Sequence, residues 1–167
     1  MRVLVTAASK HGATREIAET IRDTLLAAGL DAVAWDPHEV TSLEGFDAVV
    51  LGSGVYAGRW LAPAKRLVDR LSDELAQRPV WLFSSGPIGA PPMPETDPVD
   101  VEELMTTTAA VEHRVFAGML QRARLGLAER AVVATLRAPE GDFRDWAAVA
   151  AWSDDIARAL LRPPART

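Results

Sequence analysis

The stretch VLVTAASKHGATREIAETIRDTL (residues 3–25) decides the fold class of this 167-residue chain. It begins with an apolar run at residues 3–5, which is typical of a strand buried in a parallel sheet. From residue 13 onward, apolar residues recur every four positions among charged ones. This pattern indicates an amphipathic helix over residues 13–28 that ends at Gly29. The stretch therefore predicts a strand, a loop and a helix in that order.

The loop between this strand and this helix has the composition of an anion site. A helix N-terminus offers unpaired N–H groups and the positive end of the helix dipole. Gly12 lets the backbone curl closely around a bound group, and Lys10 adds a positive charge. Hydroxyl donors without an arginine in the loop suit a small terminal phosphate. The alternative is a hydroxyl-capped helix without a ligand. The predicted contact residues are Ser9, Lys10, His11, Gly12, Ala13 and Thr14.

Three other well-known loops do not match this one. The P-loop pattern G-x-x-x-x-G-K-[ST] needs two glycines, and only Gly12 precedes the helix. The dinucleotide pattern G-x-G-x-x-G is absent after the first strand. A response regulator needs acidic residues at the ends of strands 1 and 3. This chain has no acidic residue there, since residues 6–9 are Thr-Ala-Ala-Ser and residues 52–53 are Gly-Ser.

The rest of the chain repeats the alternation of strands and helices, which predicts one α/β domain over residues 1–162 with an open parallel sheet covered on both faces. Residues 163–167 are expected to form a flexible tail. Ligands of such sheets lie beyond the carboxyl ends of the strands, so the loops after strands 1, 3 and 4 are the expected site. Further strands are predicted at residues 31–35, 47–52, 79–84 and 115–118. Further helices are predicted at residues 60–76, 99–109, 125–136 and 145–161. Trp60 is expected in the first turn of the helix at residues 60–76, and Asp97 is expected to cap the helix at residues 99–109.

Two further loops at that edge are rich in glycine and serine. The first holds the only tyrosine of the chain, Tyr56, whose ring is expected to stack on a flat ligand. The second holds no aromatic residue, so one face of that ligand is expected to stay open. The alternatives are a flexible loop and a plain serine-rich turn. The predicted contact residues are Ser53, Gly54, Val55, Tyr56, Ala57 and Gly58 in the first loop and Ser84, Ser85, Gly86, Pro87, Ile88 and Gly89 in the second.

Composition narrows the classes of function. The chain has no cysteine, which excludes disulfides, thiol nucleophiles and iron–sulfur clusters, so any redox chemistry needs a bound cofactor. The formal net charge of -5 argues against nucleic acid as a partner. The chain starts without a signal-peptide core and has no apolar run long enough for a membrane span, so a cytoplasmic location is expected.

The three histidines do not indicate a metal site, because His11, His38 and His113 show no metal-ligand spacing. His11 lies in the predicted phosphate loop, where its ring is expected to hydrogen-bond the ligand rather than act as a general base. No Ser-His-Asp order or nucleophile elbow is present, which argues against hydrolysis.

The pattern S-x-x-G-x-T-x-x-x-A-x-x-I (residues 9–21), directly after an apolar strand, resembles the phosphate signature of flavodoxins. The resemblance implies flavin mononucleotide (FMN) as a non-covalently bound cofactor. It also implies a doubly wound, five-stranded parallel sheet with the strand order 2-1-3-4-5. In flavodoxins the loop that matches residues 84–89 presents backbone donors to the polar edge of the flavin.

Four segments resemble the menaquinone-dependent protoporphyrinogen oxidase family, in which a flavodoxin core carries an insertion before its last helix. They are SKHGATREIA (residues 9–18), GSGVYAG (residues 52–58) with the helix after it, VFAGML (residues 115–120) and Asp145-Trp146. This resemblance implies an FMN-dependent oxidoreductase or electron-transfer protein whose redox partner is a protein or a quinone.

The segment that differs most from a short flavodoxin lies at residues 119–137. Its apolar residues do not form one stripe, and four arginines surround them. Two interpretations stay open. The first is a helix covered by its own domain, and the second is a contact surface for a partner or, peripherally, for a membrane. The arginines are Arg122, Arg124, Arg130 and Arg137.

A second class of function stays open as well. A flavodoxin-like domain that no longer uses flavin would serve as a binding or regulatory module. This alternative is favoured by Ala7, where the flavodoxin signature usually has an aromatic residue. The loop at residues 84–89 favours it too, because that loop supplies no aromatic ring.

Overall fold

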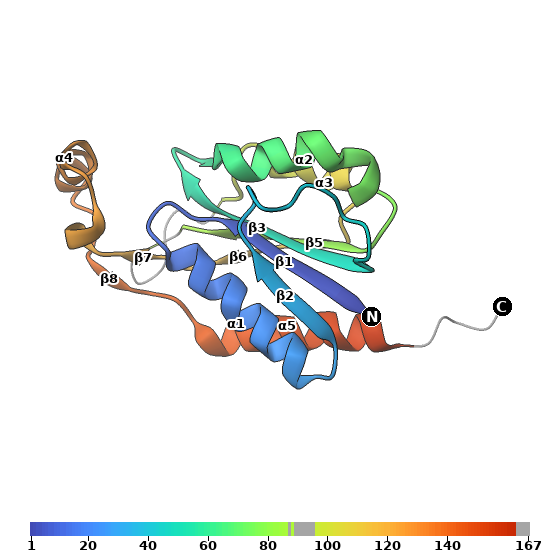
Figure 1. Ribbon diagram of the computed structural model, residues 1–167. Coiled ribbons are helices and arrows are strands. Elements are labelled where there is room, and N and C mark those ends of the chain that lie inside the picture. The colour runs from blue at the N-terminus through green and yellow to red at the C-terminus, as the bar shows by residue number, and fades with distance from the viewer. Residues whose placement is uncertain (87, 89–95, 163–167) are drawn as a thin grey trace.

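The computed structural model describes residues 1–86, 88 and 96–162, and it is built on a parallel sheet with helices on both faces (Figure 1). Its parallel strands lie in the order β2-β1-β3-β5-β6. This arrangement confirms the predicted order 2-1-3-4-5, because the additional strand β4 only pairs antiparallel with β3. The strands are β1 (Arg2–Ala8), β2 (Asp31–Trp35), β3 (Ala48–Tyr56), β4 (Arg59–Trp60), β5 (Val80–Ser85) and β6 (Glu112–Phe116).

Two helices cover each face of the sheet (Figure 1). The faces hold separate clusters of buried side chains, since successive residues of a strand point to opposite sides. In β1, Val3 and Val5 belong to the cluster under α1 and α5, whereas Leu4 belongs to the cluster under α2. One face carries α1 (Ala13–Ala27) and α5 (Trp146–Leu161), and the other carries α2 (Ala62–Leu75) and α3 (Val101–Thr108).

A close contact between β3 and β5 lies in the middle of the core. Gly52 pairs with Phe83, and a Cβ atom on Gly52 would lie 2.2 Å from Cζ of that ring. Phe83 is fully buried, and its ring centroid lies 6.1 Å from that of Phe116 and 6.2 Å from that of Trp152. The phenylalanine ring therefore fills the space that any side chain at position 52 would need.

Several boundaries differ from those predicted. β3 continues to Tyr56, so most of the glycine-rich loop expected after it is strand. Trp60 lies in β4 rather than in a first helical turn, because α2 begins two residues later. Asp100, not Asp97, occupies the N-cap position of α3. β6 begins at Glu112, earlier than predicted, because its pairing with β5 starts there.

The segment between β6 and α5 stands apart from the layered core. Its helix α4 lies away from the sheet at one end of the molecule (Figure 1), and none of its residues is buried. In the part of the chain that the structure describes, no helix has the length and apolar character needed to cross a membrane. The predicted tail at residues 163–167 lies outside the described residues. The segment contains β7 (Met119–Leu120), the 3₁₀ helix η1 (Arg122–Arg124), α4 (Leu127–Leu136) and β8 (Gly141–Asp142), which pairs with β7.

Candidate functional site

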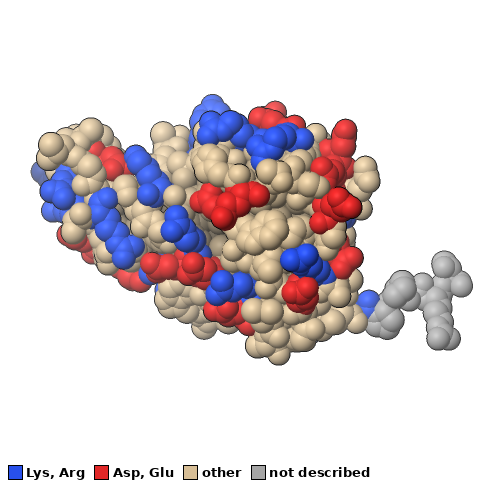
Figure 2. Space-filling model, in the orientation of Figure 1, with Lys and Arg blue, Asp and Glu red and all other residues tan. Residues whose placement is uncertain are grey.

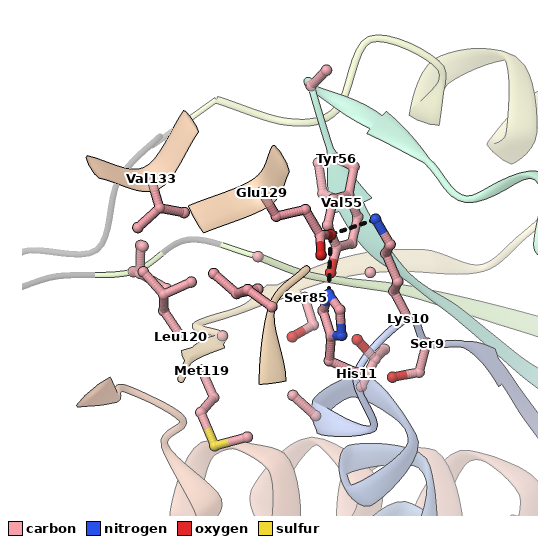
Figure 3. Close-up of a pocket in the computed structure, with 18 of the residues that line it drawn as sticks. Ser9, Lys10, His11, Val55, Tyr56, Ser85, Met119, Leu120, Glu129 and Val133 are labelled. Carbon is pink, nitrogen blue, oxygen red and sulfur yellow. Dashed lines mark hydrogen bonds and ion pairs between the residues drawn. The ribbon is translucent and has the colours of Figure 1, made fainter. Parts of the chain in front are cut away.

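A cavity of about 470 Å³ lies at the carboxyl ends of β1, β3 and β5, the edge of the sheet where a ligand was expected (Figure 3). Three of its walls come from the loop after β1, the end of β3 and the end of β5. A fourth wall comes from β7, α4 and the residues that flank them. The cavity therefore joins segments from both halves of the chain.

The first wall is the loop after β1, which directs polar groups at the cavity. Gly12 is the N-cap of α1 with a φ of 92°, a left-handed conformation that favours glycine, and its N–H donates to Ser9 Oγ at 3.0 Å. Thr14 is only 5% exposed and lines the cavity, yet its hydroxyl has no hydrogen-bond partner among the described residues. Among the described residues the fully buried polar side-chain atoms without a partner are Thr6 Oγ1 and Trp152 Nε1, so the Thr14 hydroxyl is open to the cavity and available to a ligand. Ser9, Lys10, His11 and Ala13 also line the cavity, whereas Gly12 does not.

Two side chains of this loop turn toward α4 (Figure 3). Lys10 Nζ donates to Glu129 Oε1, and His11 Nε2 lies 3.1 Å from the same oxygen. The hydrogen bond from Lys10, followed by those from the Gly126 amide and His11, lowers the pKa of Glu129 to about 2. The charge of Lys10, which the sequence suggested for a phosphate, is therefore balanced by a carboxylate of the protein.

The second wall is the end of β3. The Tyr56 ring is 40% exposed, and Lys10 Nζ lies 5.3 Å from its centroid. Burial, with a smaller contribution from Glu129, raises the pKa of Tyr56, so its hydroxyl stays protonated at neutral pH. A neutral phenol ring with a donor at its tip can stack on a flat ligand and hydrogen-bond to it. The lining residues from this wall are Gly54, Val55, Tyr56 and Ala57, whereas Gly58 does not line the cavity.

The third wall is the end of β5. Ser85, Gly86 and Ile88 line the cavity there. Ser85 is buried, and no aromatic residue contributes to this wall. Two other residues of the predicted loop, Pro87 and Gly89, lie outside the described residues.

Two of the predicted serines form hydrogen bonds inside the protein and do not line the cavity. Ser53 Oγ donates to the next carbonyl of β3 at 2.8 Å and accepts from the Leu61 amide at 2.9 Å. Ser84 Oγ accepts from Trp60 Nε1 at 2.7 Å and lies 2.8 Å from His113 Nε2. Both serines are fully buried, so they join neighbouring elements beneath the cavity.

The fourth wall is mostly apolar and lies across the cavity from the loop after β1 (Figure 3). Side chains from β7 and α4 form this wall, and the expectation that one face of a flat ligand stays open remains a prediction. Of the two interpretations left open for this segment, a helix covered by its own domain is wrong for α4, because none of its residues is buried. Its lack of a single apolar stripe was the signal in the sequence that could have indicated this. The residues of this wall are Gly118, Met119, Leu120, Leu125, Ala128, Glu129, Val132 and Val133.

The buried histidine beneath the cavity gives the protein a predictable response to acid. Burial lowers the pKa of His113, against smaller opposing contributions from Asp97 and Glu112. The unfolded chain therefore binds a proton at this histidine at higher pH than the folded chain does, and folded stability falls as the pH drops below about 6.5. We expect the free energy of unfolding of His113→Gln to fall less than that of the wild type between about pH 7.5 and pH 5.5, as measured by urea unfolding.

The exposed His38 provides the control for this measurement. His38→Gln should keep the wild-type change of unfolding free energy with pH. If His113→Gln and the wild type lose the same free energy over that pH range, the buried histidine does not cause the response.

Both the sequence and the fold match known proteins. The family model described as "Flavodoxin domain" matches residues 4–146. The chain is 23% identical over 178 residues to the protoporphyrinogen IX dehydrogenase (quinone) of Escherichia coli strain K12, an alignment that covers 98% of each chain.

Two solved structures illustrate the likeness of fold. A flavodoxin from the domain Archaea has a TM-score of 0.68 at 16% identity, over 97% of this chain and 100% of that one. Oxidised flavodoxin 1 from Bacillus cereus has a TM-score of 0.63 at 15% identity, over 95% of this chain and 98% of that one. At these identities the likeness establishes the fold.

Proposed function

Because the chain belongs to the flavodoxin domain family, we propose that it binds FMN non-covalently in the cavity and serves in electron transfer. The observation that carries this proposal is a single cavity that joins a hydroxyl- and amide-rich helix start to an exposed tyrosine ring. Its volume of about 470 Å³ lies within the range of small-ligand pockets. When bound, FMN supplies the redox chemistry that side chains of a cysteine-free protein do not provide.

The donor groups of the cavity fit the parts of FMN. We assign the phosphate to the N–H groups at the start of α1 and to Thr14, whose hydroxyl lines the cavity without a partner among the described residues. We assign the flat ring system to Tyr56, by offset stacking. The polar edge of that ring system is assigned to Ser85 and Gly86, which line the third wall.

The apolar fourth wall has a separate role in this proposal. Side chains such as Leu120, Leu125 and Val133 face the cavity opposite the polar loop. Apolar groups on this side exclude water from the ring system and lower the local dielectric, which strengthens the hydrogen bonds that the chain makes to its ligand.

A more specific activity is supported by the E. coli relative. That protein is named as a protoporphyrinogen IX dehydrogenase that uses a quinone, and the alignment covers nearly the whole of both chains. We therefore propose an oxidoreductase that acts on a tetrapyrrole precursor with a quinone as acceptor, or alternatively an electron carrier that serves a partner protein. The expected cytoplasmic location stays a prediction.

The contact surface for this redox partner is proposed at residues 119–137. In α4, Leu127 and Leu136 are 86% and 72% exposed. Figure 2 shows Lys and Arg side chains gathered over the end of the molecule that α4 forms. Exposed apolar groups bordered by cations suit either a partner protein or a peripheral contact with a membrane that carries the quinone.

Titration of the purified protein with FMN tests the proposed function. We expect quenching of FMN fluorescence and a yellow protein after removal of free flavin. A protein that leaves FMN fluorescence unchanged would instead support a flavodoxin-like binding or regulatory module without flavin.

A second measurement separates an enzyme from a carrier. The FMN-loaded protein would be reduced under anaerobic conditions and mixed with menaquinone or with a candidate partner protein. Fast reoxidation by menaquinone supports the quinone-linked enzyme, whereas reoxidation only by the protein partner supports the carrier.

A further inference from the structure

Two arginines from the segment after β6 bind the outside of the loop that follows β1. Arg124 Nη1 donates to the His11 carbonyl at 3.1 Å, and Arg144 Nη1 donates to the Ala13 carbonyl at 3.2 Å. Both guanidinium groups also contact Glu16, at 3.7 Å and 2.6 Å respectively. The sequence suggested a phosphate loop without an arginine, yet tertiary contacts bring two of them to it.

The two arginines differ in how far their charges are neutralised. Arg144 has a side chain that is 5% exposed, and it forms ion pairs with Asp142 at 2.7 Å and with Glu16 at 2.6 Å. Its pKa is raised mainly by the hydrogen bond to Asp142, which is typical of a structural ion pair. Arg124 is 43% exposed, and its 3.7 Å contact with Glu16 is longer than a hydrogen bond. Arg124 therefore retains more of its charge.

The remaining cation of the loop is already balanced. Lys10 donates to the Glu129 carboxylate, which stays ionised because its pKa is about 2. Of the two arginines that bind the loop from outside, Arg124 is thus the one without a carboxylate within hydrogen-bond distance. It does not line the cavity, so its effect on a ligand has to pass through the loop.

The hydrogen bond from Arg124 acts on one particular peptide group. The carbonyl that it binds belongs to His11, and the N–H of the same peptide belongs to Gly12. A cation on the oxygen polarises the peptide and strengthens its N–H as a donor. This N–H donates to Ser9 Oγ at 3.0 Å, and Ser9, unlike Gly12, lines the cavity, so the effect reaches a ligand through Ser9. The same guanidinium lies over Gly12, since a Cβ atom there would be 3.8 Å from Arg124 Nη1. Thr14, whose hydroxyl has no partner among the described residues, lies two residues further along and lines the cavity.

We propose that Arg124 is a positioning residue for the phosphate group of FMN. Its hydrogen bond to the His11 carbonyl fixes the orientation of the His11–Gly12 peptide, whose N–H donates to Ser9 Oγ. Its guanidinium also adds a positive charge behind the start of α1. This inference rests on the proposed function and deepens it, because it assigns part of the phosphate recognition to a residue outside the flavodoxin signature. Riboflavin lacks the phosphate, so its binding should not depend on Arg124.

The test compares FMN with riboflavin on the full-length protein at low ionic strength. Dissociation constants would be measured by fluorescence quenching for the wild type, Arg124→Met and Arg124→Lys. We expect Arg124→Met to weaken FMN binding by roughly three- to tenfold and to change riboflavin binding by less than about twofold. Arg124→Lys keeps the charge and should restore most of the FMN affinity.

Arg122→Met is the matched control, because Arg122 lies in the same short helix and contacts Glu140 at 3.8 Å instead of the loop. Equal weakening of FMN and riboflavin by Arg124→Met would indicate a merely structural role and overturn the inference. Unchanged FMN affinity would overturn it as well. If the wild type binds FMN and riboflavin equally, flavin binding stands but the role of Arg124 in phosphate recognition is overturned. If the wild type binds neither flavin, both the proposed function and the role of Arg124 are overturned.

Discussion

Replacing Thr14 by leucine is expected to abolish retention of FMN while leaving the fold intact. Thr14 is the buried cavity residue whose hydroxyl lacks a partner among the described residues, at the start of α1. A hydrogen bond to a charged group contributes about 1.5–3 kcal/mol, and the leucine side chain would in addition extend into the space assigned to the phosphate. We therefore expect the dissociation constant for FMN to rise by roughly 100-fold or more, measured by fluorescence quenching.

Two further variants make this result interpretable. Thr14→Ser keeps the hydroxyl and should bind FMN within about tenfold of the wild type, since it loses only a methyl group. Thr24→Leu makes the same change further along α1, where the threonine hydroxyl donates to the Thr20 carbonyl at 2.9 Å, and it should leave FMN binding unchanged. Wild-type FMN affinity in Thr14→Leu would contradict the assignment of the phosphate to this loop.

Gly52→Ala is expected to produce the largest loss of stability. The new Cβ atom would lie 2.2 Å from Cζ of Phe83, a distance that no relaxed structure tolerates. The ring cannot simply move away, because it is fully buried and packs near Phe116 and Trp152. Overpacking of a well-filled core commonly costs 1–3 kcal/mol, and we expect about 3 kcal/mol or more here. The measurement is the free energy of unfolding in urea.

A double-mutant cycle tests whether the ring is the cause. Phe83→Leu shortens the side chain that the new methyl group would meet, so the double variant should be more stable than the sum of the single changes by more than about 1 kcal/mol. Gly126→Ala is the control, because Gly126 is exposed and the nearest atom to its added Cβ is 3.6 Å away. Additive effects of Gly52→Ala and Phe83→Leu would contradict the steric explanation. If Gly52→Ala alone fails to fold, a double variant that also fails to fold would contradict it.

The parallel sheet could be predicted from local patterns, and its strand order from the resemblance of residues 9–21 to the flavodoxin signature. The apolar run at residues 3–5, the four-residue period that follows and the stop at Gly29 are contained in one stretch of chain. β1 and α1 lie where that stretch predicted them, with ends that differ by at most three residues. Short right-handed connections then leave few ways to arrange the strands. The general place of the cavity followed from the same rule, because ligands lie beyond the carboxyl ends of the strands.

Individual site residues were harder to predict, because composition does not show the direction of a side chain. Ser53 and Ser84 were expected among the ligand contacts, but both are buried in hydrogen bonds between elements. Tyr56 and Ser85 line the cavity. A serine-rich strand end presents its residues alternately to two sides, and only the packing of neighbouring strands decides which side faces a ligand.

The sequence by itself determined the α/β class and the loop at the start of α1, because hydrophobic period and turn residues act over a few neighbouring positions. The strand order followed from the resemblance to flavodoxins. Tertiary structure alone decided the electrostatics of that loop. Lys10 and Glu129 are 119 residues apart in the chain, and His11 and Arg124 are 113 apart. Such pairs leave no local pattern. They meet only because the segment after β6 returns to the edge of the sheet where β1 ends.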